Sequence, residues 1–261
     1  MSRHHLLPGR PSLRLFAVCY RNLLVWRKLA VPSLLGNLAD PLIYMLGLGY
    51  GLGALLPSVA GTSYIHFLAA GTLCYSTMNG ATFEALYSGF SRMHVQKTWD
   101  AIMNAPLSID DIVIAEALWA AIKASFSGLA ILLVAWALGL IGGAVALWLI
   151  PLIALVGFTF GALGLVMTVL APNYDFFMYY FTLFITPMVL IGGVFFPLAQ
   201  LPAGIQLLAQ CLPLTHAVAL ARPLLGGSIP DEVGLHLGVL AGYAVFGLLA
   251  ALVLARRRLL G

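Results

Sequence analysis

Long runs of apolar residues with few charges recur along the whole of this 261-residue chain. Six of them, at 34–56, 64–89, 112–140, 146–170, 176–196 and 233–255, reach the roughly 20 residues that a helix needs to cross a bilayer. Apolar residues make up 62% of the chain and charged residues 8%, whereas a soluble domain carries about 25% charged residues. The sequence therefore excludes a water-soluble fold and a disordered chain, and it predicts a multi-pass membrane protein.

The apolar runs predict helices rather than the strands of a barrel. A barrel strand alternates polar and apolar residues, whereas segments such as 129–138 are apolar on every face. No segment between the runs has the composition of a separate soluble domain. We expect an all-α integral membrane fold with six transmembrane helices in one domain, residues 33–258, after an N-terminal segment, residues 1–32.

The basic residues predict the orientation of these spans, because cytoplasmic segments hold the excess of Lys and Arg. With six spans, twelve of the thirteen basic residues fall on one side and Arg222 falls on the other. We therefore expect an inner-membrane protein whose two termini and 90–111 loop are cytoplasmic. The twelve residues are Arg3, Arg10, Arg14, Arg21, Arg27, Lys28, Arg92, Lys97, Lys123, Arg256, Arg257 and Arg258.

The N-terminal segment 10–28 has the pattern of an amphipathic helix. Its charges interrupt any apolar core of a signal peptide, so we expect this segment to remain attached. One interpretation is an anchor among anionic headgroups, which the pattern alone favours; the other is an elbow helix that also contacts a cytoplasmic partner. Arg10, Arg14, Arg21 and Lys28 share one side, and Leu15, Cys19, Leu23 and Trp26 lie near the opposite side.

The loop after the second span predicts a short helix rather than a flexible linker. Its apolar residues Val95, Trp99, Ile102 and Met103 have helical spacing. Pro106 would end this helix, and the segment from Ser108 to Asp111 resembles a capping box that opens the next helix. The loop is either a mechanical contact point for a partner or a tight connector on the headgroups.

The segment between the fifth and sixth spans, 196–222, is apolar but contains Pro197, Pro202 and Pro213. These prolines divide it into pieces that are too short to cross a bilayer. We expect two short re-entrant or surface helices on the outer side.

Catalytic and nucleotide-binding motifs are missing from the sequence. Lys97 and Thr98 follow Ser91 and Gln96 where a phosphate-binding loop needs glycines. The cysteines Cys19, Cys74 and Cys211 are far apart, and the six histidines include no metal-binding pair. We therefore predict no enzyme activity, metal or bound cofactor in this chain, and we expect any ATP to be hydrolysed by another polypeptide.

Two acidic residues, Asp40 and Glu84, lie within predicted spans near their cytoplasmic ends. A charge in a bilayer usually faces protein or a wet cavity. These carboxylates could line a substrate path, or they could snorkel to the surface and support helix packing.

The motifs of residues 185–222 resemble the signature of the type-two ABC exporter permeases. The residues that carry the resemblance are Gly192, Gly193, Pro202, Pro213, His216 and Arg222. Over nearly the whole chain, the sequence is similar to the branch of this family that exports nodulation lipo-oligosaccharides, through the segments 34–41, 67–71, 81–84, 98–99, 171–172 and 256–260. The N-terminus, the third and fourth spans and the 226–236 loop depart from that branch.

The resemblance implies a homodimer that binds two separate ABC ATPase subunits on its cytoplasmic side. It would export a lipo-oligosaccharide or a similar amphiphilic glycoconjugate across the inner membrane. Segment 10–28 would be the connecting helix and segment 94–105 the coupling helix. The residues expected to couple to the ATPase are Arg14, Arg21, Lys28, Arg92, Lys97, Trp99 and Asp100.

Two other functions remain open from the sequence. A secondary carrier or channel would need no ATPase, but it should show internal repeats and broken helices near the midplane. A membrane enzyme should show clustered polar catalytic residues. Neither pattern is clear in the sequence, so an ATP-driven exporter is the leading hypothesis.

Overall fold

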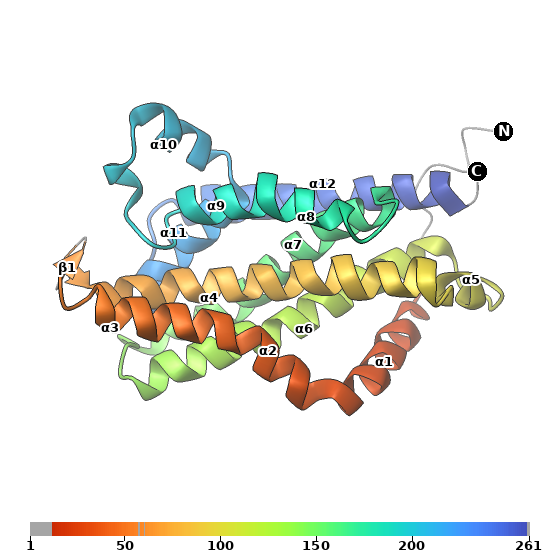
Figure 1. Cartoon of the computed structure of the whole chain (residues 1–261), viewed down its shortest axis with the longest axis horizontal. Helices are drawn as coiled ribbons and strands as arrows, with labels where there is room; N and C mark the ends of the chain where they lie inside the picture. The colour runs from red at the N-terminus through yellow and green to blue at the C-terminus, as the bar shows by residue number, and fades with distance from the viewer. Residues whose placement is uncertain (1–11, 57, 60, 260–261) are drawn as a thin grey trace.

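The computed structural model describes residues 12–259 except 57 and 60, without the side chains of Leu34, Asn37, Leu38 and Asp40. Its long helices lie side by side along the long axis of the molecule (Figure 1). Helices α1 (Leu15–Trp26) and α5 (Thr98–Met103) lie at one end, called the α5 end here, and α10 (Ala203–Gln210) and the short β-strands lie at the other, the α10 end (Figure 1). Arg3 and Arg10 lie outside the described residues.

Among the described residues, three helices are long and apolar enough to cross a membrane: α6 (Ile109–Ala137), η6 with α7 (Ala144–Leu170) and α12 (Val233–Leu259). A fourth is obtained if α10 (Ala203–Gln210) and α11 (Pro213–Leu225), which meet at 88°, count as one broken span. The apolar helix formed by α8 (Phe176–Tyr180), η7 (Phe181–Ile185) and α9 (Thr186–Ile191) is shorter. The predicted count of six spans therefore remains a prediction.

The first two predicted spans are helical, with local π-helical turns. The first comprises α2 (Ala30–Ile43), η3 (Tyr44–Leu48) and α3 (Gly49–Gly51); the second comprises α4 (Tyr64–Phe83), η4 (Glu84–Gly89) and η5 (Ser91–Val95). A two-residue hairpin, β1 (Ser58–Val59) with β2 (Thr62–Ser63), joins them. In the described part of the chain these four residues are the only ones in strands, so the predicted helical membrane fold is confirmed apart from this hairpin.

The core lies where α7 packs against α4, α6 and α12. Small residues allow these helices to approach closely, as is usual between helices in membranes. A Cβ atom on Gly157 would lie 3.1 Å from Ala121 Cα, and one on Gly161 would lie 2.9 Å from Ala120 Cβ.

The N-terminal segment forms α1 (Leu15–Trp26) and the 3₁₀ turn η2 (Arg27–Leu29) before α2. Its buried face, Leu15, Val18, Cys19 and Asn22, packs against α6. Leu23, predicted to lie on this side, is exposed. Burial, followed by the negative charge of Glu116, raises the pKa of the Cys19 thiol to about 11. Cys74 is also buried, whereas Cys211 is exposed.

The loop between α4 and α6 holds a short helix, α5 (Thr98–Met103). Lys97 precedes it with φ at 49°, in the left-handed region, which turns the chain sharply into the helix. The predicted capping box is confirmed: Asp111 N donates to Ser108 Oγ at 3.1 Å, and Ser108 N donates to Asp111 Oδ2 at 3.0 Å. The left-handed turn at Lys97 and the capping box together fix where α5 lies relative to α6.

Candidate functional site

Two buried carboxylates, Glu84 on η4 and Glu116 on α6, share one guanidinium at the α5 end. Arg92 Nη2 lies 2.9 Å from Glu84 Oε1. Arg92 Nε donates to Glu116 Oε1 at 2.9 Å and to Oε2 at 3.1 Å. This arginine therefore connects the end of the second predicted span to the third. Isolated buried charges are very unfavourable, so the three side chains stabilise one another only together.

Two further donors, both on α6, interact with the carboxylate of Glu84. Lys123 Nζ lies 2.6 Å from Glu84 Oε2 in a second ion pair. Trp119 Nε1 donates to Glu84 Oε1 at 2.8 Å. Glu84 is thus held by α6 as well as by Arg92, which favours the helix-packing interpretation of this residue over an open substrate path.

Glu116 receives hydrogen bonds from two other elements. Trp99 Nε1 on α5 donates to Glu116 Oε1 at 3.3 Å, and Asn22 Nδ2 on α1 donates to the same oxygen at 3.4 Å. We call Asn22, Glu84, Arg92, Trp99, Glu116, Trp119 and Lys123 the buried charge network. It fastens α1, α5 and the end of the second predicted span to α6.

Trp99 is fully buried, with 0% of its surface exposed. Its ring is covered by α6 and neighbouring residues of this chain. The expectation that Trp99 couples to an ATPase stays a prediction. Val95, predicted on the same apolar face, is instead 64% exposed. The outward side of α5 presents Lys97, Asp100 and Asn104.

The structure brings some of the predicted coupling residues together and leaves others apart. Arg14 Nη1 donates to the Pro106 carbonyl at 2.7 Å and so ties α1 to the α5–α6 connection. Arg21 Nη2 lies 3.5 Å from Thr98 Oγ1 at the start of α5. Lys28 is exposed on η2, away from the network.

A second set of contacts closes the α5 end. Arg256 near the end of α12 forms a buried ion pair with Asp110 at the start of α6, with Nε 2.7 Å from Oδ1. Arg258 donates to the Ala171 carbonyl at 2.9 Å, and Ser12 N donates to Asp111 Oδ1 at 2.7 Å. The C-terminal arginines, interpreted from sequence as topology signals, therefore also hold the bundle together.

The signature residues lie near the α10 end and shape its turns. Gly192 ends α9, and Gly193 follows with φ at +77°, a conformation that favours glycine. Pro202 is the N-cap of α10 and Pro213 is the first residue of α11, so the chain is divided at these two prolines, as predicted.

Arg222, on α11, holds a helix end rather than facing an open cavity. Its Nη2 donates to the Gly193 carbonyl at 2.7 Å. Its guanidinium carbon also lies 3.6 Å from the centre of the Phe67 ring on α4, a cation–π contact. These contacts support a structural role for Arg222.

We predict that Arg222→Ala lowers the free energy of unfolding by about 2–4 kcal/mol, because it removes a charged hydrogen bond and a cation–π contact. The yield of folded protein should fall as a result. Arg222→Lys should restore part of the loss, since lysine retains a charged donor. Size-exclusion yield and denaturant unfolding measure both effects, with exposed Arg257→Ala as the control. Normal folding of Arg222→Ala, with export lost for one substrate class, would instead make it a recognition residue.

His216 connects three segments at the α10 end. Its Nε2 lies 2.8 Å from the Gln210 carbonyl, so that nitrogen carries the proton and donates. Its Nδ1 lies 2.8 Å from His236 Nδ1 on α12 and accepts in the neutral state. In the described part of the chain, no group of three or more His, Cys, Asp or Glu residues could hold a metal ion.

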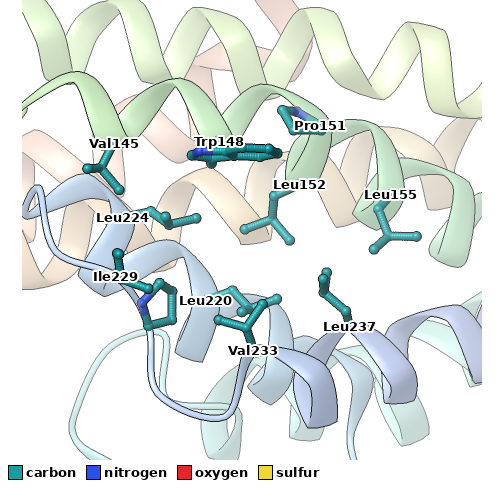
Figure 2. Close-up of a pocket in the computed structure, with 11 residues that line it drawn as sticks. Val145, Trp148, Pro151, Leu152, Leu155, Leu220, Leu224, Ile229, Val233 and Leu237 are labelled. Atoms are coloured by element: carbon teal, nitrogen blue, oxygen red, sulfur yellow. The ribbon is translucent and has the colours of Figure 1, made fainter.

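An apolar groove of about 470 Å³ runs between α7, α11 and the start of α12 (Figure 2). Trp148 and Leu152 line one wall, and Leu220 and Leu237 face them (Figure 2). None of the predicted site residues that the structure describes lines this groove. The predicted residue Asp40 lies on α2, but its side chain is outside the described set.

Sequence reasoning identified Glu84, Arg92 and Trp99 but missed Asn22, Glu116, Trp119 and Lys123 as their partners. One signal was available: Glu116 and Lys123 are seven residues apart on one predicted helix and therefore share a face. A buried carboxylate and lysine on that face require partners of opposite charge, and Glu84 and Arg92, at the end of the preceding predicted span, were candidates.

The chain is similar to known membrane transport proteins. The family model described as ABC-2 type transporter matches residues 14–225. Nodulation protein J of Rhizobium meliloti (strain 1021) is 47% identical over 244 residues, covering 94% of this chain and 93% of that protein. Nodulation protein J of Rhizobium leguminosarum bv. viciae is 48% identical over 249 residues, covering 95% of this chain and 96% of that protein. Inner membrane transport permease YadH of Escherichia coli (strain K12) is 24% identical over 202 residues, covering 77% of this chain and 76% of that protein.

Proposed function

The chain belongs to the ABC-2 type transporter family, and from this membership we propose that it is the permease subunit of an ATP-driven exporter whose ATP is hydrolysed by a separate ABC ATPase subunit. The observation that carries the proposal is the buried charge network. It joins α1 and α5, the two elements that the resemblance assigns to ATPase contact, to the membrane helix α6.

The network gives α5 a rigid connection to the bundle. A helix of six residues has little stability of its own. Its first two residues, Thr98 and Trp99, are buried against the bundle. The ion pair of Arg92 with Glu116 holds the neighbouring helices together. A force applied by an ATPase to the exposed side of α5 would therefore move α6 and the end of the second predicted span together. The outward residues Lys97, Asp100 and Asn104 are the proposed contact surface.

This proposal places the α5 end and both chain termini in the cytoplasm, in agreement with the distribution of basic residues. We expect reporter fusions at both ends of an inner-membrane protein to give the cytoplasmic signal, and a fusion in the α10 segment at position 207, which is exposed, to give the periplasmic signal. A periplasmic signal from the C-terminal fusion would contradict the six-span orientation.

The proposed substrate is a lipo-oligosaccharide or another amphiphilic glycoconjugate. The nodulation protein J relatives and the wholly apolar groove between α7, α11 and α12, which fits an acyl chain, support this choice.

We further propose a homodimer of permeases with two ATPase subunits similar to nodulation protein I. The homodimer is the assembly that the family resemblance implies.

Reconstitution tests the proposed function. Vesicles containing the permease and its ATPase should move a labelled lipo-oligosaccharide only when Mg²⁺ and ATP are present on the side of the ATPase. Vesicles with the permease alone should not, because this sequence lacks a phosphate-binding loop. Transport by the permease alone, driven by an ion gradient, would contradict the proposal and favour a secondary carrier.

A further inference from the structure

A polar cavity of about 370 Å³ lies in the angle between α1 and α2, beside η4, η5 and α6. Figure 1 shows α1 and α2 meeting at an angle at one side of the bundle. The cavity wall includes three cationic side chains, Arg21, Arg92 and Lys123, and one carboxylate, Glu84, together with Trp26, Ser33 and Ser88. It is thus a polar, aromatic-edged site between membrane helices rather than an apolar groove.

The charges around this cavity do not balance. Arg92 and Lys123 are paired with Glu84 and Glu116. Arg21 takes part in none of the ion pairs formed among the described residues. It donates to neutral oxygens instead, to Asn22 Oδ1 at 3.0 Å and to Thr98 Oγ1 at 3.5 Å. Three cations therefore face two carboxylates, and the excess positive charge is on a half-buried guanidinium.

The electrostatic surroundings of Arg21 agree with this excess. Burial and the positive charge of Arg92 lower the pKa of Arg21, and Glu116 opposes them only in part. A bound anion would offset both effects, because it would supply the opposite charge that a buried cation needs.

The position of the cavity beside a lipid-facing helix indicates which class of anion it binds. Along the side of α1 away from the bundle, Phe16, Tyr20 and Leu23 are exposed apolar side chains, as expected for a helix lying against lipid. Basic pockets between helices at the cytoplasmic surface are suited to anionic lipid headgroups. We propose that this cavity binds the phosphate of an anionic phospholipid from the adjacent leaflet, with Arg21 as the principal ligand and with Lys123 and Trp26 at its edge.

The assignment of that leaflet as the cytoplasmic one rests on the orientation proposed above; the site itself does not. A headgroup held there would join α1 to α6 through Arg21 and Lys123. It would therefore strengthen the same α1–α6 contact that the buried charge network makes through Asn22.

Binding of short-chain phospholipids to the full-length permease, measured in detergent by native mass spectrometry, tests the proposal. Phosphatidylglycerol should bind about tenfold more tightly than phosphatidylcholine, because a charge-assisted hydrogen bond is made without a competing cationic headgroup. Arg21→Gln should remove this preference. Arg27→Gln, which removes an exposed charge on η2 outside the cavity, should retain it.

Two further variants separate binding from folding. Arg21→Lys keeps the charge and should keep the preference for phosphatidylglycerol within about threefold. Ser88→Phe should weaken binding by obstructing the cavity while every charged residue remains. Each variant is first checked for wild-type elution by size exclusion. Equal binding of the two lipids by the wild-type protein, or identical results for Arg21→Gln and Arg27→Gln, would overturn the proposal.

Free glycerol 3-phosphate distinguishes the source of the phosphate. It should fail to displace phosphatidylglycerol when the two are at equal concentrations, because it cannot insert acyl chains beside α1. Displacement at equal concentration would overturn the lipid as the occupant. The measurement needs neither the ATPase nor export, so a failure of the proposed transport function would leave its result unchanged.

Discussion

Arg92→Met is expected to destabilise the permease by about 3–5 kcal/mol, because it removes the cation shared by two buried carboxylates. Lys123 still neutralises Glu84, but Glu116 is left with only neutral donors among its described partners. The protein that does fold should show strongly reduced export, because the Arg92–Glu116 connection between η5 and α6 is lost, although the Glu84–Lys123 pair remains. Denaturant unfolding in detergent and export in reconstituted vesicles measure the two effects.

A second substitution separates the charge from the packing. In Arg92→Met with Glu116→Gln, no carboxylate is left without a cation, and most of the lost stability should return. Export should remain low, since the Arg92–Glu116 ion pair that joins η5 to α6 is still missing. The control Arg257→Met, at an exposed position on α12, should stay within about 0.5 kcal/mol of wild type. A double variant as unstable as Arg92→Met would contradict this account.

Trp99→Ala is expected to destabilise the permease alone by about 3–5 kcal/mol, because it removes a fully buried indole and one donor to Glu116. Loss of ATPase binding in this variant would then follow from the loosened α5, not from a lost contact with the ATPase. Unfolding of the purified permease without its partner measures this effect directly.

Val95→Ala provides the matched control, since Val95 lies on the neighbouring turn but is 64% exposed. Its stability should change by less than about 0.5 kcal/mol. Trp99→Phe should recover part of the packing without the hydrogen bond. If Trp99→Ala had wild-type stability and yet failed to bind the ATPase, Trp99 would be an interface anchor, and its burial against α6 would be wrong.

The long helices α4, α6, α7 and α12 could be predicted from the sequence because each one lies on its own apolar run. The capping box at Ser108 and the short helix before Pro106 were also predictable, since both depend on residues that are close in sequence. The β1–β2 hairpin was not, because two-residue strands leave no periodic pattern. The bent α10–α11 pair followed from its prolines, but the 88° angle depends on what each helix packs against.

The site was less predictable than the fold, because its contacts join distant segments. Asn22 and Glu116 are 94 residues apart, and Asp110 and Arg256 are 146 residues apart. A charge near the end of a span has several explanations in sequence, including orientation, snorkelling and pairing. Arg256 illustrates the difficulty: the rule that predicts its side of the membrane does not report its ion pair with Asp110.

The central claim, that the outward side of α5 receives the ATPase, is tested most directly by site-specific cross-linking in the assembled transporter. A photoreactive residue is introduced at position 104, exposed beside α5, or at position 207, exposed on α10 at the opposite end. We predict a cross-link to the ATPase from position 104 and none from position 207. A cross-link from position 207, with none from position 104, would contradict the claim.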